Sequence, residues 1–137
     1  MSILTPIPMI LLALSATPPH LTPAELVPFL KVISASLGTP GRVACKDIDL
    51  SMQLKKDGLS PDGGAPVAWA ASDAQIRNYL ATGSRLVVCG DEAGLKDGAS
   101  IAIFREGGKP VLVVSVKNAA ANGFTLSDAL LKIATRK

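Results

Sequence analysis

The sequence predicts a single three-layer α/β domain: a short parallel β-α-β-α-β sheet, extended by a C-terminal antiparallel hairpin and a final helix. Its 137 residues suit one ordinary domain. Between residues 42 and 89, short apolar runs alternate with helical patterns, which is typical of parallel strands joined by right-handed crossovers. Further on, Gly107 and Gly108 separate two apolar runs and predict a hairpin.

Helix and strand signals follow one another along the chain. Thr22 and Glu25 form a capping box for a helix that continues to about residue 37. Residues 42–45 form a strand candidate, and Asp47 or Asp49 caps a helix that ends near residue 58. Residues 60–64 have the composition of a loop. Together these segments predict the first helix, strand and crossover of the domain.

The second half repeats the alternation and then changes. We expect a strand at residues 66–70, a helix at 72–83, and an almost wholly apolar strand at 85–89. Residues 100–104 and 111–116 form the predicted hairpin. A helical turn at 119–123 and a helix from residue 125 complete the domain.

Composition excludes several classes of protein. Hydrophobic residues make up 48% of the chain and charged residues 18%, which is too apolar for a disordered chain. The net charge of +3 is not clustered, because the longest basic run is Lys55-Lys56, so no nucleic-acid partner is expected. One histidine and two cysteines cannot by themselves supply four zinc ligands. We therefore expect no catalytic residue, no metal site and no cofactor.

The N-terminus resembles a secretory signal. Residues 1–16 carry no charge, and the apolar block at 9–14 precedes the small pair Ser15-Ala16. This favours a signal peptide at 1–16, a linker at 17–21, and a periplasmic or secreted domain at 22–137. A buried strand and a misassigned start codon are the alternatives. The apolar stretch is too short to span a membrane, and His20, in a proline-rich linker, is expected to be an inert surface side chain.

The C-terminal part of the chain carries a recognisable pattern. Residues 86–91 end an apolar strand, a hairpin follows, and the tail contains Ala119, Gly123, a Leu-Ser pair at 126–127 and a Leu-Leu pair at 130–131. This pattern resembles the C-terminal half of the YfiR/HmsC-like family. The resemblance covers about residues 44–137 and is most specific after residue 85.

The resemblance implies a function without chemistry. Better-known members of that family are similar to periplasmic repressors that bind the sensor part of an inner-membrane diguanylate cyclase, and so restrain cyclic-di-GMP signalling and biofilm formation. We therefore expect a small exported regulator that binds a protein partner. The resemblance also implies that disulfides occur in such proteins.

Cys45 and Cys89 each end a predicted parallel strand. We number the predicted parallel strands in chain order: 42–45, 66–70 and 85–89. If their order in the sheet is 2-1-3, the strands that end at Cys45 and Cys89 are neighbours. Neighbouring strands lie about 4.8 Å apart, inside the Cα separation of about 4.4–6.8 Å that a disulfide needs. The alternative is two buried thiols that act as small hydrophobic side chains. The sequence leaves both open.

Acidic residues follow the same two strands. Asp47, Asp49 and Asp91 are expected near the carboxyl ends of the strands, where open α/β sheets bind ligands at a topological switch point. Carboxylate oxygens suit a hard cation or another small ligand. Asp47 and Asp49 serve equally well as helix caps. A small-ligand or cation-binding module is thus the second hypothesis for function.

The predicted hairpin supplies a third hypothesis. An exposed strand edge accepts a further strand from a partner, and the apolar residues of the hairpin would form that interaction edge. A structural subunit that docks or self-associates in this way is the third expected class of protein. The residues assigned to this edge are Ile101, Ile103, Val111 and Val113.

Overall fold

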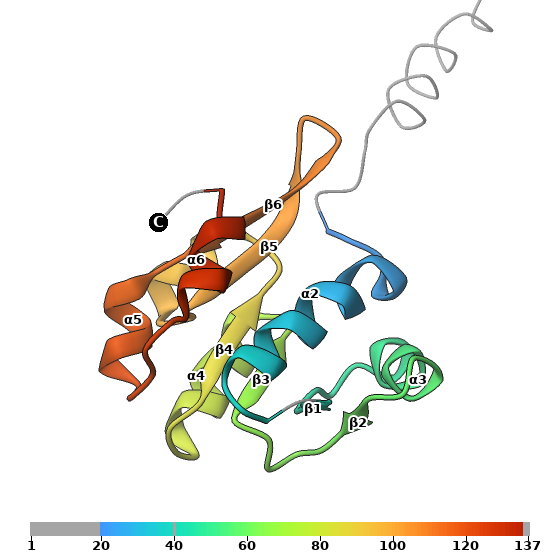
Figure 1. Ribbon diagram of the computed structural model, residues 1–137. Helices are drawn as coiled ribbons and strands as arrows, with labels where there is room; N and C mark the ends of the chain where they lie inside the picture. Colours follow the sequence, from blue (N-terminus) through green and yellow to red (C-terminus); the bar gives the residue numbers. More distant parts are fainter. Residues whose placement is uncertain (1–19, 40, 136–137) are drawn as a thin grey trace, which may run out of the picture.

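A computed structural model describes residues 20–39 and 41–135 of the chain (Figure 1). The predicted signal peptide at 1–16, and the first three residues of the predicted linker, lie outside the described residues. The domain that follows contains helices on both sides of a sheet, so the predicted α/β fold class is confirmed.

Four strands form the main sheet in the order β3-β4-β5-β6. β3 (Val67–Ala70), β4 (Leu86–Cys89) and β5 (Ile101–Glu106) are parallel, and β6 (Lys109–Val114) is antiparallel to β5. The turn between β5 and β6 is Gly107-Gly108, and both glycines have positive φ, as a two-residue type I′ hairpin turn requires. The predicted hairpin is therefore confirmed, but β5 ends two residues later, and β6 begins and ends two residues earlier, than the sequence indicated.

Two further short strands extend the sheet beyond β3. β1 (Arg42–Val43) pairs in parallel with β2 (Ser60–Pro61), inside the stretch predicted as a loop. Ala44 continues β1 and bridges Ala68 of β3. The amide of Ala44 donates to the carbonyl of Val67 at 2.8 Å, and the carbonyl of Ala44 accepts from the amide of Trp69 at 2.8 Å. β3 therefore lies between β1 and β4. The predicted order 2-1-3, in which the strand at 42–45 lies next to the strand at 85–89, is wrong.

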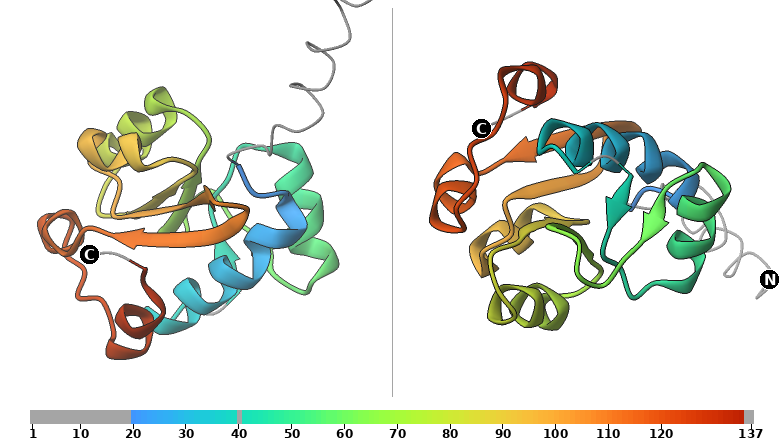
Figure 2. Two further views of the ribbon diagram at one scale, coloured as in Figure 1. Left: turned by 90° about the horizontal axis from the view of Figure 1, so that it is seen from above. Right: turned by 60° about the horizontal axis from the view of Figure 1, so that its bottom comes forward.

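Helices cover the sheet on its two faces (Figure 2). α2 (Pro23–Ser36), α3 (Ile48–Lys56) and α6 (Asp128–Ile133) lie on one face, which we call the aliphatic face. α4 (Asp73–Ala81) and the 3-10 helix η2 (Glu92–Asp97) lie on the other, the alanine face. α5 (Val116–Ala121) follows β6 and leads to α6.

The two faces carry different side chains because strand residues alternate sides. Those on the aliphatic face are mostly large, whereas those on the alanine face are mostly small or of medium size. The aliphatic face of the sheet consists of Val67, Trp69, Leu86, Val88, Ile101, Ile103, Leu112 and Val114. The alanine face of the sheet consists of Ala68, Ala70, Val87, Cys89, Ala102, Phe104, Val111 and Val113.

Helix starts follow the side chains expected to cap them. Thr22 and Glu25 form the predicted capping box of α2. Asp47, rather than Asp49, is the N-cap of α3, and Ser72 is the N-cap of α4. The pattern did not predict η2, whose N-cap is Asp91. Local hydrogen bonds thus fix the points at which the chain turns away from the strand ends.

Candidate functional site

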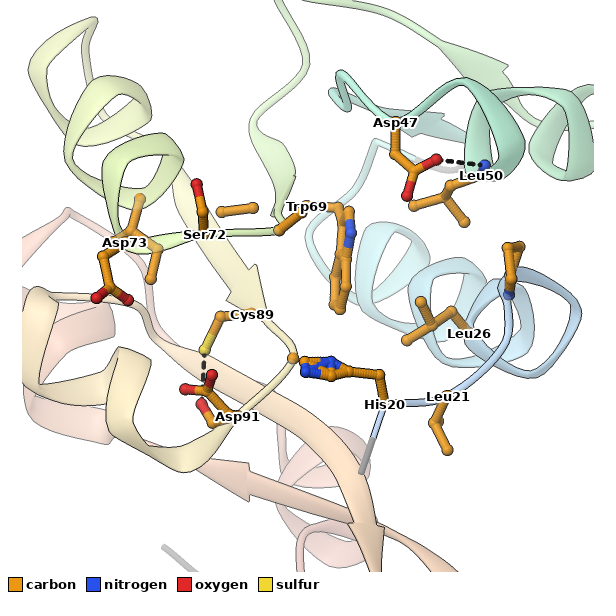
Figure 3. A pocket seen from close by; sticks show the side chains of 15 residues that line it. His20, Leu21, Leu26, Asp47, Leu50, Trp69, Ser72, Asp73, Cys89 and Asp91 are labelled. Atoms are coloured by element: carbon orange, nitrogen blue, oxygen red, sulfur yellow. Dashed lines mark hydrogen bonds between the residues drawn. The ribbon is translucent and has the colours of Figure 1, made fainter. Parts of the chain in front are cut away.

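The carboxyl ends of β3 and β4 open into a pocket of about 150 Å³ (Figure 3). Its walls combine apolar side chains with carboxylates, a serine, an indole and an imidazole. Residues from the N-terminal segment, α2, α3, β3, α4 and the loop after β4 contribute to it. The lining residues are His20, Leu21, Pro23, Leu26, Asp47, Leu50, Trp69, Ala70, Ala71, Ser72, Asp73, Ile76, Cys89, Gly90 and Asp91.

Connectivity explains why the pocket forms at this position. After β1 the chain runs through α3 on the aliphatic face and returns as β2, on the side of β1 away from β3. After β3 it runs through α4 on the alanine face and returns as β4, parallel to β3 and on the side of β3 away from β1. The crevice between such diverging crossovers is the topological switch point of an α/β sheet. The switch point lies between β1 and β3, one strand away from its predicted place.

Two of the three predicted carboxylates lie in the wall of this pocket. Asp47 and Asp91 both line it, whereas Asp49 lies on the exposed side of the first turn of α3. Asp47 also caps α3, since its Oδ1 accepts from the amides of Asp49 at 2.9 Å and Leu50 at 3.3 Å. Asp91 Oδ1 likewise accepts from the amide of Gly94 at 2.9 Å. Asp47 and Asp91 therefore each cap a helix and also line the pocket.

Trp69 and His20 are pocket residues that sequence reasoning did not assign. Trp69 is only 6% exposed, and its indole N–H has no hydrogen-bond acceptor among the described residues. His20 and Trp69 both lie against Gly90, because a Cβ built on that glycine would be 3.3 Å from the indole ring and 3.5 Å from His20 Nδ1. The glycine after β4 was visible in the sequence, but its neighbours come from elements distant along the chain.

Asp73 is the third carboxylate at the pocket and follows the α4 cap, Ser72. Among residues 20–39 and 41–135, no group of three or more His, Cys, Asp or Glu side chains is arranged to hold a metal ion. The pocket thus joins apolar walls to separated carboxylates and an available indole donor. Such a lining suits a small organic ligand with a positively charged or hydrogen-bonding group better than a bare cation.

The two cysteines are unpaired. β3 separates their strands, so they lie roughly 10 Å apart at two strand spacings, too far for a disulfide. They also point to opposite faces, because Cys45 packs on the aliphatic face and Cys89 on the alanine face. The predicted neighbouring-strand geometry for a bridge is therefore absent, because β3 lies between the two strands.

The thiols occupy different environments. Cys45 is half-buried, and its Sγ lies 2.9 Å from Ser51 Oγ. Cys89 is 2% exposed, and burial raises the pKa of its thiol to about 12. The backbone carbonyl of Asp91 accepts a hydrogen bond from Cys89 Sγ at 3.1 Å. Cys89 is therefore a packing residue beneath the pocket.

The predicted interaction edge also needs correction. Ile101 and Ile103 lie on β5, which is paired on both sides, by β4 and β6. Val111 and Val113 lie on the edge strand β6, but their side chains are packed into the core. An edge accepts a partner through its backbone, so the relevant residues are those of β6 whose backbone groups point outward.

Exposed apolar side chains gather on another element. Ile48 is 75% exposed and Met52 is 65% exposed, one turn apart on α3. Lys55 and Lys56 continue the same exposed side in the last turn of the helix. We call these four residues the α3 surface. It presents two large apolar groups bordered by positive charge, a composition typical of a contact with another molecule.

Comparison with known proteins supports the fold. A conserved domain protein from Vibrio cholerae O1 biovar El Tor has a similar solved structure, with a TM-score of 0.63 at 13% sequence identity. The similarity covers 85% of this chain, which spans 60% of the length of that protein. No curated protein matches the sequence. No helix in the described part of the chain has the length and apolarity to cross a membrane.

The family comparison covers the C-terminal half of the chain. Residues 68–135 match the family described as YfiR/HmsC-like. The match runs from β3 through the parallel strands and the hairpin to α6. The sequence resemblance after residue 85 is therefore confirmed, and the chain belongs to the YfiR/HmsC-like family.

Proposed function

We propose that this protein is a periplasmic regulator without catalytic activity, which binds the sensor part of a membrane diguanylate cyclase or a related signalling protein. Its membership of the YfiR/HmsC-like family is the observation that carries this proposal. The family resemblance implies a repressor that restrains cyclic-di-GMP synthesis. In this account the protein works by occupying a surface of its partner.

The α3 surface is the contact that we assign to this partner. Ile48 and Met52 expose large apolar area that no described segment of the chain covers. Burial of such side chains is the main favourable term in association, and bordering charges steer the encounter and fix its orientation. Lys55 and Lys56 would meet acidic groups around an apolar patch on the partner.

The test compares cells that lack the gene with cells that carry it again. Loss of the gene should raise cyclic-di-GMP and biofilm formation, and the unchanged chain should restore both. The double variant Ile48→Glu/Met52→Glu should fail to restore them at an equal amount of folded protein, because two carboxylates replace the apolar contact. Val116→Glu on α5, where Val116 is 49% exposed, is the matched control and should behave as the unchanged chain.

Each result decides a separate part of the proposal. Unchanged cyclic-di-GMP after loss of the gene would contradict the proposed function. Full restoration by the double variant would leave the regulator in place but would contradict the α3 surface as its contact. Both readings require equal periplasmic abundance, measured on the same cells.

A second candidate function is small-ligand binding at the strand ends. It is favoured by the presence of Asp47, Asp91 and Trp69 in the wall of one pocket, where the indole N–H has no acceptor among the described residues. Asp47→Asn and Asp91→Asn preserve the caps, since asparagine caps helices as well as aspartate does, but remove the negative charge. Calorimetric titration with small primary amines should give binding that the double variant loses. Equal heats in both proteins would reject this function.

A further inference from the structure

β6 forms one edge of the four-stranded sheet. The amide of Ser115 donates to the carbonyl of Ser100 at 2.8 Å, which fixes the phase of the hydrogen bonds between β5 and β6. Hydrogen-bonded pairs alternate with non-hydrogen-bonded pairs in an antiparallel ladder, so Val111 and Val113 turn their backbone groups toward β5. The residues whose backbone groups point away from β5 are Pro110, Leu112 and Val114.

A single residue after α6 occupies the middle of this outward row. The amide of Thr135 donates to the carbonyl of Leu112 at 2.6 Å, and the amide of Leu112 donates to Thr135 Oγ1 at 3.2 Å. Ala134, the C-cap of α6, has extended backbone angles (φ −68°, ψ 132°) and directs the chain to this position. The hydroxyl of Thr135 thus takes the place of the carbonyl that a neighbouring strand would offer.

The first outward position is protected in another way. Pro110 has no N–H, so it accepts but cannot donate a hydrogen bond to an added strand. Proline and covering segments are both devices that keep exposed strand edges from pairing with other chains. In β6 the two devices lie two residues apart, at Pro110 and Leu112.

We propose that Thr135 closes this edge against a second copy of the chain, and that β6 pairs with β6 of that copy when Thr135 withdraws. This inference does not depend on the proposed function. It replaces the predicted interaction edge, which used side chains, with one that uses outward backbone groups.

The outward groups of β6 are self-complementary in one antiparallel register. With a twofold axis at Leu112, the Leu112 amide of each copy donates to the Leu112 carbonyl of the other. The amide of each Val114 donates to the carbonyl of the opposite Pro110, and this register requires no donor from Pro110. It overlaps the whole outward row, from Pro110 to Val114.

The test removes the cover without touching β6. Thr135→Pro, in the full chain, deletes both the amide donor and the hydroxyl acceptor that hold Leu112. We expect sedimentation equilibrium to show a dimer with a dissociation constant at least tenfold lower than that of the unchanged protein. Thr135→Ser keeps both groups and should leave the dissociation constant unchanged.

A second substitution shows whether the dimer uses this edge. Val114→Pro removes an outward donor that no β5 pairing needs, so Thr135→Pro/Val114→Pro should lose the gain in dimerisation. A monomeric Thr135→Pro variant, or a dimer that persists in the double variant, would overturn the proposal.

An independent measurement needs only the folded monomer. Thr135→Val keeps the shape and the amide but removes Oγ1, so the amide of Leu112 should exchange with solvent at least tenfold faster. The amide of Val113, bonded toward β5, should exchange as in the unchanged protein. Unaltered exchange at Leu112 would show that Thr135 does not close the edge.

Discussion

The two faces of the sheet are both covered by helices, but they pack against them with side chains of different size. On the aliphatic face, α2 and α3 insert Leu30, Ile33, Leu50 and Leu54, all fully buried, against large strand residues. On the alanine face, α4 and η2 approach a surface that is partly alanine, and the backbone itself comes close. Large side chains therefore fill the space between helices and sheet on the aliphatic face, whereas on the alanine face the helix backbone lies closer to the sheet.

Gly94 shows how close that approach is. A Cβ built on Gly94 of η2 would lie 2.5 Å from Cys89 Sγ and 3.0 Å from Ile76 Cδ1. η2 can cover the end of β4 only because no side chain stands between them. Truncation should therefore damage the aliphatic face most, whereas enlargement should damage the alanine face most.

The largest contrast between the faces concerns their thiols. Burial raises the pKa of Cys89 from 9.0 to about 12, which lowers its thiolate fraction near pH 8 by about a thousandfold. Cys45, on the aliphatic face, is half-buried. Iodoacetamide at pH 8 should therefore label the folded protein once, at Cys45, and label Cys89 only after unfolding. Peptide mass mapping decides this, and early labelling of Cys89 would show that η2 does not seal the alanine face.

Truncation at the centre of the aliphatic face should cost the most stability. Leu30 is fully buried between α2 and the sheet, so Leu30→Ala should lower the free energy of unfolding by about 2–5 kcal/mol through lost burial and a cavity. Urea unfolding followed by circular dichroism measures this. Val32→Ala, on the exposed side of the same helix, is the control and should change stability by less than about 0.5 kcal/mol.

Enlargement on the alanine face should have the next largest effect. Gly94→Ala forces the new methyl group against Cys89 Sγ, which should cost about 1–3 kcal/mol. Cys89→Ala alone removes a buried sulfur, but in the Gly94→Ala background it relieves the contact. The double variant should thus be less destabilised than the sum of the single variants, as a double-mutant cycle in urea would show. Strict additivity would mean that η2 simply moves aside.

Sequence reasoning predicted the elements of the fold well because their signals are local. Thr22 with Glu25, Asp47, Ser72 and the double glycine of the hairpin each act within a few residues, and each begins or ends an element as expected. Ser60–Pro61 was not predicted, because a two-residue strand has no periodicity of its own and exists only through its pairing with β1.

The candidate site was predicted only in part, because its assembly is not local. Asp47 and Asp91 line one pocket, since parallel strands end at a common edge of the sheet. The position of β3 between β1 and β4 depends on long-range pairing, and no local pattern encodes it. That one misplacement also explains why a disulfide remained one of two alternatives, and why Trp69 was omitted, since its strand stood outside the predicted switch point.

Ion pairs that link helices to neighbouring elements give the smallest predicted difference between the faces. On the aliphatic side, Arg105 of β5 donates to Glu25 of α2, and this hydrogen bond lowers the pKa of Glu25 to about 2. On the alanine side, Arg77 of α4 and Asp97 of η2 approach only to 3.8 Å, and Arg77 is 63% exposed. Only the Arg105–Glu25 pair is held by a capping box as well as by its charge partner.

Acid should therefore act through Glu25. A carboxylate whose pKa is lower in the folded than in the unfolded state stabilises the fold above its unfolded value of 4.5, and this contribution disappears as the pH falls toward 2. Glu25→Gln should lower the urea midpoint at pH 6 and converge with the unchanged protein near pH 2. Asp97→Asn, the matched change on the alanine face, should have almost no effect at either pH, as exposed ion pairs contribute little. A pH-independent loss in Glu25→Gln would assign its role to packing at the start of α2, and the two faces would then not differ in their use of charge.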